Sequence, residues 1–110
     1  MPDVMADRRS SPRYNLIVAA SLVESGSVTR ISARTSDVSR AGCYVETLTP
    51  ISKEKALRIV LTRGEETFET QGRVTYASPG LGMGIQFDQP IDTHQLAVLD
   101  SWLEKATPLR

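Results

Sequence analysis

The chain has 110 residues, of which 40% are hydrophobic and 24% are charged, and its 13 lysines and arginines balance its 13 aspartates and glutamates. This length supports one domain with a single core, and the composition excludes a globally disordered chain. A net charge of zero lacks the basic excess expected of a protein that binds duplex DNA, so any anion site must be local.

The predicted elements begin after a polar, charged stretch. Residues 1–12 show no periodicity, which predicts a flexible arm that bears arginines. The apolar run 14–23 and the alternating run 28–36, separated by Ser25 and Gly26, predict a β-hairpin. Residues 42–47 and 57–62 predict a third and a fourth strand. Structure is therefore expected to begin near Arg13.

Two further strands complete the β pattern. The fifth follows a turn at 63–65 and runs through residue 76, with Phe68, Val74 and Tyr76 on one parity. That parity predicts that Tyr76 packs in the core. The sixth strand covers residues 83–87, and we expect close backbone approach at Gly82 and Gly84.

From residue 92 onward, the apolar residues recur with the spacing of an α-helix instead of that of a strand. Asp92 and Gln95 have the acid-x-x-amide spacing of a helix start, and an apolar stripe follows. The stripe consists of Leu96, Val98, Leu99, Trp102 and Leu103. Because Pro108 disfavours continuation, we expect a helix over 92–106 and a tail over 107–110. The stripe could cap the chain's own sheet or join two copies, which leaves both monomer and homodimer open.

Six short strands followed by one amphipathic helix predict a mostly β fold. The expected architecture is a six-stranded antiparallel barrel over residues 13–90 with a C-terminal helix. A sandwich is the alternative arrangement, but closure removes the exposed sheet edges that a domain of this size could not easily cover.

Two short polar motifs carry the functional signal. Arg9 and Arg13 form RxxxR, and Asp37, Ser39 and Gly42 form DxSxxG. A guanidinium presents a planar donor fork that fits a phosphate or the Hoogsteen edge of guanine. A carboxylate beside a hydroxyl can accept hydrogen bonds from the opposite edge of the same base. One anionic guanine nucleotide would satisfy both motifs.

In this order and with this strand pattern, the two motifs resemble the PilZ domain family over residues 8–106. The resemblance extends to the sequence GCYV at 42–45 and to GMGIQF at 82–87. Members that carry both motifs bind the bacterial second messenger cyclic di-GMP, so the resemblance implies this ligand, and it implies a barrel with one helix.

The family pattern also implies a role for each motif residue. Arg9 and Arg13 would hold the phosphates and the Hoogsteen edge or the face of one guanine. Asp37 and Ser39 would bind the N1 and N2 side of the base. Gly42 would allow close backbone approach or a positive φ.

The resemblance implies a stand-alone sensor whose arginine arm orders over the bound dinucleotide and changes the interaction with an unidentified effector protein. Arg8, directly before RxxxR, is similar to the residue that in PilZ proteins favours a stacked pair of ligand molecules. One alternative is a PilZ-fold interaction adaptor that binds no nucleotide. Another is an oligonucleotide-binding barrel, which would need a basic groove and more aromatic residues than this chain has.

The sequence offers little for catalysis. His94 and Cys43 are the only histidine and cysteine, too few for a zinc cluster of the usual stoichiometry, and no nucleophile-elbow, P-loop or Rossmann motif occurs. We therefore expect no enzyme activity, no metal and no cofactor. The lone cysteine, the absence of a secretion signal and the absence of a bilayer-spanning stretch predict a cytoplasmic protein without direct membrane insertion.

Overall fold

The computed structural model describes residues 11–109, which form eight strands and one helix. The elements are β1 (Tyr14–Asn15), β2 (Ala19–Glu24), β3 (Arg30–Val38), β4 (Gly42–Glu46), β5 (Ala56–Arg63), β6 (Glu66–Ser78), β7 (Gly82–Phe87), α2 (Thr93–Glu104) and β8 (Thr107–Pro108).

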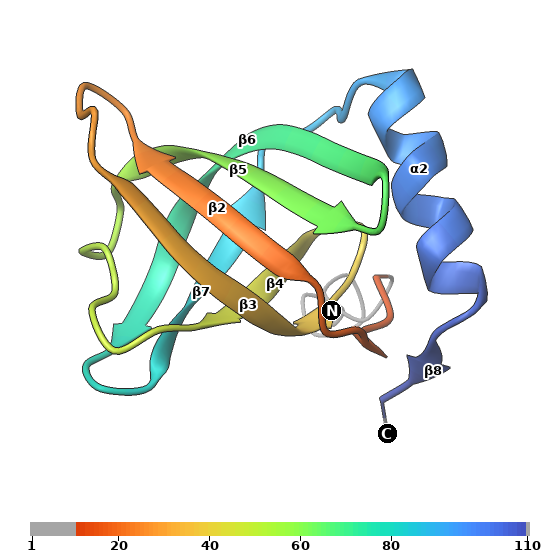
Figure 1. The fold of residues 1–110 in the computed structure, drawn as a ribbon, viewed down its shortest axis with the longest axis horizontal. Coiled ribbons are helices and arrows are strands. Elements are labelled where there is room, and N and C mark those ends of the chain that lie inside the picture. The colour runs from red at the N-terminus through yellow and green to blue at the C-terminus, as the bar shows by residue number, and fades with distance from the viewer. Residues whose placement is uncertain (1–10, 110) are drawn as a thin grey trace, which may run out of the picture.

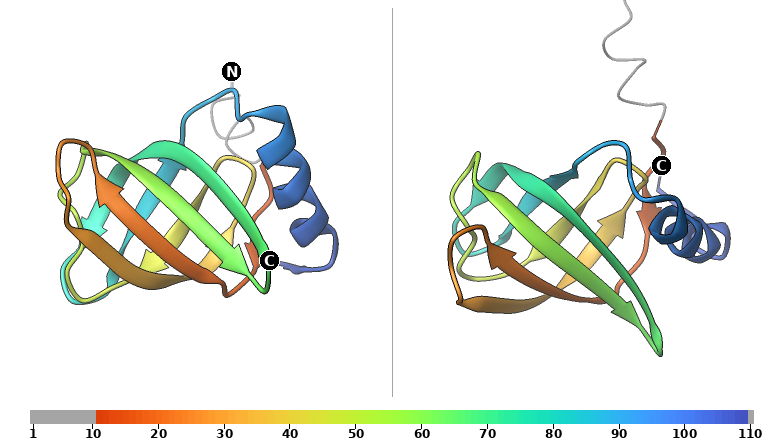
Figure 2. Two further views of the ribbon diagram at one scale, coloured as in Figure 1. Left: turned by 45° about the horizontal axis from the view of Figure 1, so that its top comes forward. Right: turned by 90° about the horizontal axis from the view of Figure 1, so that it is seen from above.

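Six of these strands close into a barrel. The strand order is β2-β5-β6-β7-β4-β3, and β3 pairs back onto β2 to complete the ring. All six pairings are antiparallel. Figures 1 and 2 show the strands wrapping around a single interior. The predicted six-stranded antiparallel barrel is confirmed.

The barrel interior is filled by alternate side chains of every strand. Residues with at most 1% exposure come from all six strands: Leu22, Val38, Val45, Leu57, Ile59, Leu61, Phe68, Val74 and Phe87 among them. The rings of Phe68 and Phe87 meet with centroids 5.3 Å apart. Strands with one buried and one solvated face explain the period-two pattern of the sequence.

The first predicted strand, residues 14–23, is in fact two strands. The break falls where the Thr35 hydroxyl donates to the carbonyl of Leu16 at 2.6 Å and accepts the N–H of Val18 at 3.0 Å. A buried side chain thus replaces ladder bonds at the bend. β1 continues along the end of β3, and β8 pairs with the other edge of β1.

Helix α2 begins as its sequence predicts but uses its polar residues differently. Asp92 is the N-cap, and its carboxylate accepts the main-chain N–H groups of His94 and Gln95. The Gln95 side chain does not complete a capping box, because its oxygen accepts the N–H of Glu69 at 2.7 Å instead. The helix ends at Glu104, and the expected tail forms β8.

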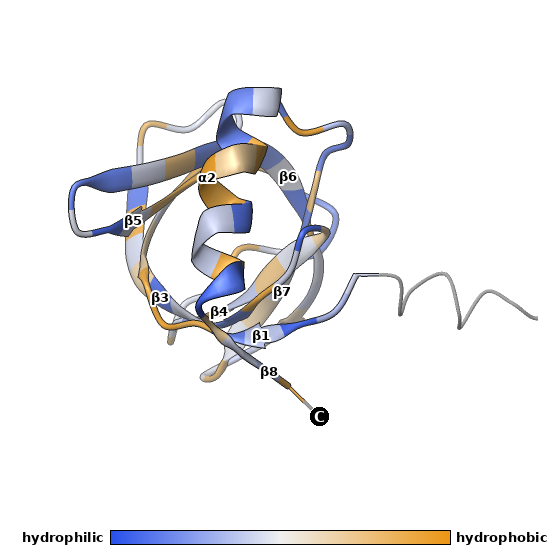
Figure 3. Ribbon diagram, turned by 90° about the vertical axis from the view of Figure 1, so that its right-hand side faces the viewer, coloured by the Kyte–Doolittle hydropathy of each residue, from blue (hydrophilic) through white to orange (hydrophobic). Residues whose placement is uncertain are grey.

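The apolar face of α2 closes one end of the barrel (Figure 3). Leu99 and Trp102 are fully buried and Leu103 nearly so. The Trp102 indole N–H donates to the Glu66 carboxylate at 2.9 Å, which satisfies its polar atom at the edge of the interior. The stripe therefore packs within the chain. Among the described residues, no helix is long and apolar enough to cross a membrane.

The helix should contribute core stability. We expect Leu99→Ala to lower the free energy of unfolding by about 2–5 kcal/mol, because it empties a fully buried position. Leu48→Ala, the same substitution at a side chain that is 79% exposed, should change it by less than about 0.5 kcal/mol. Urea denaturation followed by fluorescence measures both, and equal effects would show that α2 is not part of the core.

Candidate functional site

The register of β1 on β3 brings the two sequence motifs together. Tyr14 pairs with Val38 and Asn15 with Asp37, so the same register continued by one residue places Arg13 opposite Ser39. Arg13 is then the diagonal neighbour of Asp37, within reach of a long side chain. The second arginine of RxxxR and the acid of DxSxxG meet because β1 and β3 are antiparallel.

A β-bulge turns Asp37 to the outer face of the barrel. The pairing of β3 with β4 shifts between Thr35 and Asp37. Thr35 and Val38 are both buried although they are three residues apart, which strict alternation does not allow. The extra residue at Ser36 changes the parity, so Asp37 faces outward while Val38 remains in the core.

A second bulge does the same for Tyr76, and the prediction that Tyr76 packs in the core is wrong. The pairing of β6 with β7 shifts between Val74 and Tyr76. Val74 is fully buried, whereas Tyr76 is 48% exposed. The extra residue, Thr75, donates its hydroxyl to the carbonyl of Gly84 at 3.2 Å. Beyond the bulge, the residues that face inward and those that face outward exchange places. Sequence alternation alone could not reveal this change.

The two bulges align one row of residues across the outer face. Asp37 pairs with Tyr44, Tyr44 with Gly84, and Gly84 with Tyr76. Three strand spacings separate the ends of this row, about 14 Å. The rings of Tyr44 and Tyr76 lie 6.0 Å apart between centroids, inclined by 30°. An acid thus lies at one end of the row and Tyr76 at the other, with the Tyr44 ring between them.

The row forms the floor of a hollow of about 770 Å³, which we call the outer hollow. Its lining consists of Ser11, Arg13, Asp37, Ser39, Ala41, Gly42, Cys43, Tyr44, Thr75, Tyr76, Gly84, Ile85 and Gln86. This volume lies in the range of small-molecule sites in proteins, 300–1,000 Å³. Four of the six residues predicted from the motifs lie here: Arg13, Asp37, Ser39 and Gly42.

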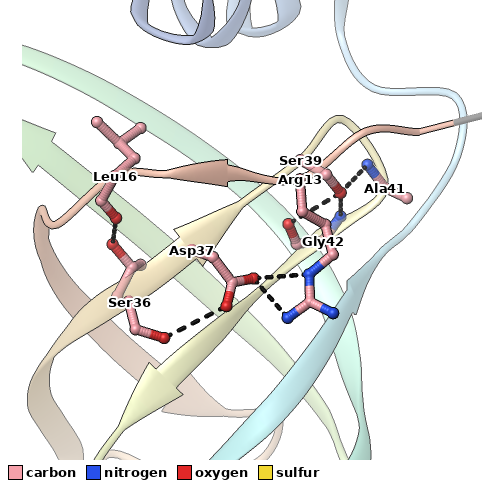
Figure 4. Close-up of polar contacts among 8 residues, drawn as sticks. Arg13, Leu16, Ser36, Asp37, Ser39, Ala41 and Gly42 are labelled. Carbon is pink, nitrogen blue, oxygen red and sulfur yellow. Dashed lines mark hydrogen bonds and ion pairs between the residues drawn. The ribbon is translucent and has the colours of Figure 1, made fainter. Parts of the chain in front are cut away.

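Arg13 and Asp37 form an ion pair in the hollow (Figure 4). The Arg13 Nη2 and Nε atoms lie 2.8 and 3.0 Å from the same carboxylate oxygen, Oδ1. Among the described residues 11–109, the other oxygen, Oδ2, accepts one long bond, from the Ser36 hydroxyl at 3.4 Å. The Asp37 side chain is 13% exposed and that of Arg13 is 56% exposed. Within the described part of the chain, the pair leaves the Oδ2 atom and part of the guanidinium without a close partner.

Ser39 organises the turn between β3 and β4. Its hydroxyl oxygen accepts the N–H groups of Ala41 at 3.0 Å and of Gly42 at 3.2 Å, as Figure 4 shows. The Ser39 N–H donates to the Gly42 carbonyl at 2.8 Å. These bonds are typical of a turn closed by its own serine. The side chain is almost fully buried, so it shapes the rim of the hollow through the backbone.

Glycines keep the floor of the outer hollow open. A Cβ atom at Gly42 would overlap the main-chain oxygen of Ile85, and one at Gly84 would overlap the ring of Tyr76. The sequence predicted either a positive φ or close backbone approach at Gly42. Gly42 does not adopt a positive φ, so close backbone approach is the reason for glycine at this position. The predicted close backbone approach is confirmed at Gly82, where a Cβ would overlap the Val45 main-chain oxygen, whereas at Gly84 the close neighbour is the Tyr76 side chain.

Arg40, inside DxSxxG, points away from the hollow toward the helix. Its Nε and Nη2 atoms each lie 3.0 Å from an oxygen of Asp100. Gln89 donates to the Arg40 carbonyl at 3.2 Å. The turn that holds Ser39 is thereby tied to α2. Arg73 is exposed on the barrel wall outside the hollow.

The remaining predicted site residues, Arg8 and Arg9, lie outside the described residues. Sequence reasoning did not assign the other lining residues to a site, Tyr44 and Gln86 among them. Tyr44 could have been found, because it alternates with the apolar Cys43 and must face outward if Cys43 faces the core.

Cys43 lines the outer hollow, but its thiol has low reactivity. Burial raises the pKa of its thiol, and the nearby Asp37 carboxylate raises that pKa further. The thiol is therefore protonated at neutral pH, which makes it a poor nucleophile. In the part of the chain that the structure describes, no group of three His, Cys, Asp or Glu residues could hold a metal ion.

Comparisons with solved structures reveal the same fold in PilZ proteins. The Bacillus subtilis inhibitor of motility (MotI/DgrA) superposes with a TM-score of 0.69 at 18% identity over 89% of this chain. This chain spans about half of that protein, 51%. The PilZ domain of CeSA from a cellulose-synthesizing bacterium superposes with a TM-score of 0.64 at 19% identity, covering 84% of this chain and 95% of that domain.

Sequence comparisons point the same way. No curated protein matches the chain. The family model for the PilZ domain matches residues 7–105, which includes both motifs and every strand of the barrel. The chain therefore belongs to the PilZ domain family.

Proposed function

We propose that this protein is a receptor for cyclic di-GMP that binds the dinucleotide in the outer hollow. One observation carries the proposal: a single hollow of about 770 Å³ is lined by Arg13 of the first motif and by Asp37 and Gly42 of the second. A cationic fork and an anionic acceptor in one site match the phosphates and the guanines of this ligand.

The ion pair prepares both groups for the ligand. In the free protein Arg13 and Asp37 hold each other in position, so neither has to be ordered when the nucleotide arrives. The Asp37 Oδ2 atom, which among the described residues accepts one long bond, would accept from the N1 and N2 groups of a guanine. The Arg13 guanidinium, exposed at its far side, would contact a phosphate or the Hoogsteen edge.

The aromatic end of the row offers a second contact for the ligand. Tyr76 is half exposed beside Tyr44 above the Gly84 backbone. A guanine could stack against the exposed face of the Tyr76 ring, a contact worth about 1–3 kcal/mol for bases on aromatic side chains. Acid and aromatic ends about 14 Å apart suit a ligand that carries two bases.

The rest of the proposal concerns the arm. Arg8 and Arg9 would close over the nucleotide, and the third arginine would offset the charge of a stacked second molecule. Ordering of the arm would then change the affinity for an effector protein, because a ligand shifts an equilibrium only through differential binding.

A second candidate function is a PilZ adaptor that binds partners without nucleotide. The Arg13–Asp37 ion pair favours it to this extent: the two residues satisfy each other without a ligand. In that case the motifs would only fasten β1 to β3. The change in cyclic di-GMP affinity that one substitution at Asp37 causes distinguishes the two functions.

Asp37→Asn separates guanine recognition from general electrostatics. The change removes a negative charge, so simple attraction of an anion would strengthen binding. If Asp37 accepts from guanine, the Asn amide keeps one acceptor oxygen but replaces the other with an NH2 group, which faces a guanine N–H, and affinity for cyclic di-GMP should fall at least tenfold. Isothermal titration calorimetry measures this, with Arg73→Ala at an exposed arginine outside the hollow as the control. No binding heat for the wild type would favour the adaptor.

The number of ligand molecules tests the role of Arg8. We expect calorimetry on the wild type to give two cyclic di-GMP molecules per chain, and Arg8→Ala to give one. The physical reason is that a second dinucleotide brings two more phosphates into the site, and one fewer cation leaves their repulsion uncompensated. Arg58→Ala, which removes a remote arginine from the outer face, should retain two. A ratio of one for the wild type would contradict this expectation.

A further inference from the structure

The short strand β8 lies where it can control the position of Arg13. β1 has only two residues and lies between β3 on one side and β8 on the other. Figure 3 shows β1 and β8 side by side below the end of the barrel that α2 covers. The pairing continues one residue beyond β8, because the Leu109 N–H donates to the Arg13 carbonyl at 2.8 Å. The backbone of Arg13 is thus held by residue 109.

The sequence of β8 fits this role. Tyr14 pairs with Pro108 and Asn15 with Thr107, so Leu109 lies opposite Arg13. Hydrogen-bonded and non-hydrogen-bonded pairs alternate along an antiparallel ladder. The bonded pair at 13 and 109 makes the pair at 14 and 108 non-bonded, and Pro108 loses no bond there by lacking an N–H.

The helix fixes β8 in turn. Trp102 and Leu103 are buried in the end of the barrel. Their carbonyls accept the N–H groups of Lys105 and Ala106, at 3.2 and 3.1 Å, which close the last turn just before β8 begins. A rigid path of packed residues and main-chain bonds therefore runs from the barrel interior through α2 to Arg13.

The ion pair alone would hold Arg13 weakly. The Arg13 side chain is 56% exposed, and an ion pair at that exposure contributes about 0–1 kcal/mol because water screens it. Without β8, the two residues of β1 would also be an open edge with unpaired main-chain groups. A binding group needs its backbone fixed as well as its side chain. The backbone bond from Leu109 supplies that fixation on the side opposite β3.

We propose that residues 107–109 are a positioning element for the ligand site, holding Arg13 in register with Asp37. This inference rests on the proposed function for its effect on affinity. Its effect on Arg13 exists in the free protein and does not require a ligand.

The test removes one hydrogen atom from the backbone. Leu109→Pro eliminates the N–H that Arg13 accepts, whereas Leu109→Ala shortens the side chain and keeps the N–H. We expect Leu109→Pro to weaken cyclic di-GMP binding about fivefold, the usual worth of one hydrogen bond, and Leu109→Ala to bind as the wild type does. Calorimetry gives the affinities, and urea denaturation verifies that both variants keep the folded barrel.

A second readout uses the free protein. In nitrogen-15 NMR spectra the Arg13 Nε–H signal should be sharp in the wild type and in Leu109→Ala, because it donates to Asp37. It should broaden in Leu109→Pro. An unchanged signal and unchanged affinity in Leu109→Pro would overturn the role of β8 while leaving the receptor intact. A wild type that binds no nucleotide would overturn the receptor, and the NMR signal would still decide the role of β8.

Discussion

The antiparallel pairing of β1 with β3 is the constraint on which the candidate site depends. It joins residues 24 positions apart in the sequence, and it determines which side chains meet. A slip of one residue would turn Arg13 to the other face of its strand. Main-chain bonds to β3 and β8 fix the register, and the Arg13–Asp37 ion pair depends on it. Electrostatic attraction alone, half exposed to water, could not establish the geometry.

The site also depends on two local departures from regular sheet geometry. Bulges at Ser36 and Thr75 turn Asp37 and Tyr76 outward, while Val38 and Val74 remain in the core. One sheet can therefore keep a continuous apolar interior and still present an acid and an aromatic ring on its outer surface. The Ser39 turn and the Gly84 backbone complete the hollow between them. Asp37 and Tyr76 therefore lie outside the core, on the lining of the hollow.

Much of this arrangement could be predicted from the sequence, and the failures have physical causes. Strict alternation at Phe68 and Val74 predicted the inward face of β6, and Asp92 marked the helix start. Tyr76 was wrongly assigned to the core because one inserted residue reverses parity and leaves no mark in composition. The strand β8 was missed because two residues carry no periodicity, and its partner lies more than ninety positions away. The motif residues could be identified, but their convergence required the register.

An NMR titration of the wild type with cyclic di-GMP tests the central claim most directly. If the dinucleotide binds in the outer hollow, the largest amide shifts will fall on Gly42, Gly84 and Gln86, which line it. Amides near Leu48 and Leu81, which line a different hollow on the barrel, will move little. Shifts concentrated at Leu48 and Leu81, or no shifts at saturating nucleotide, would contradict the account.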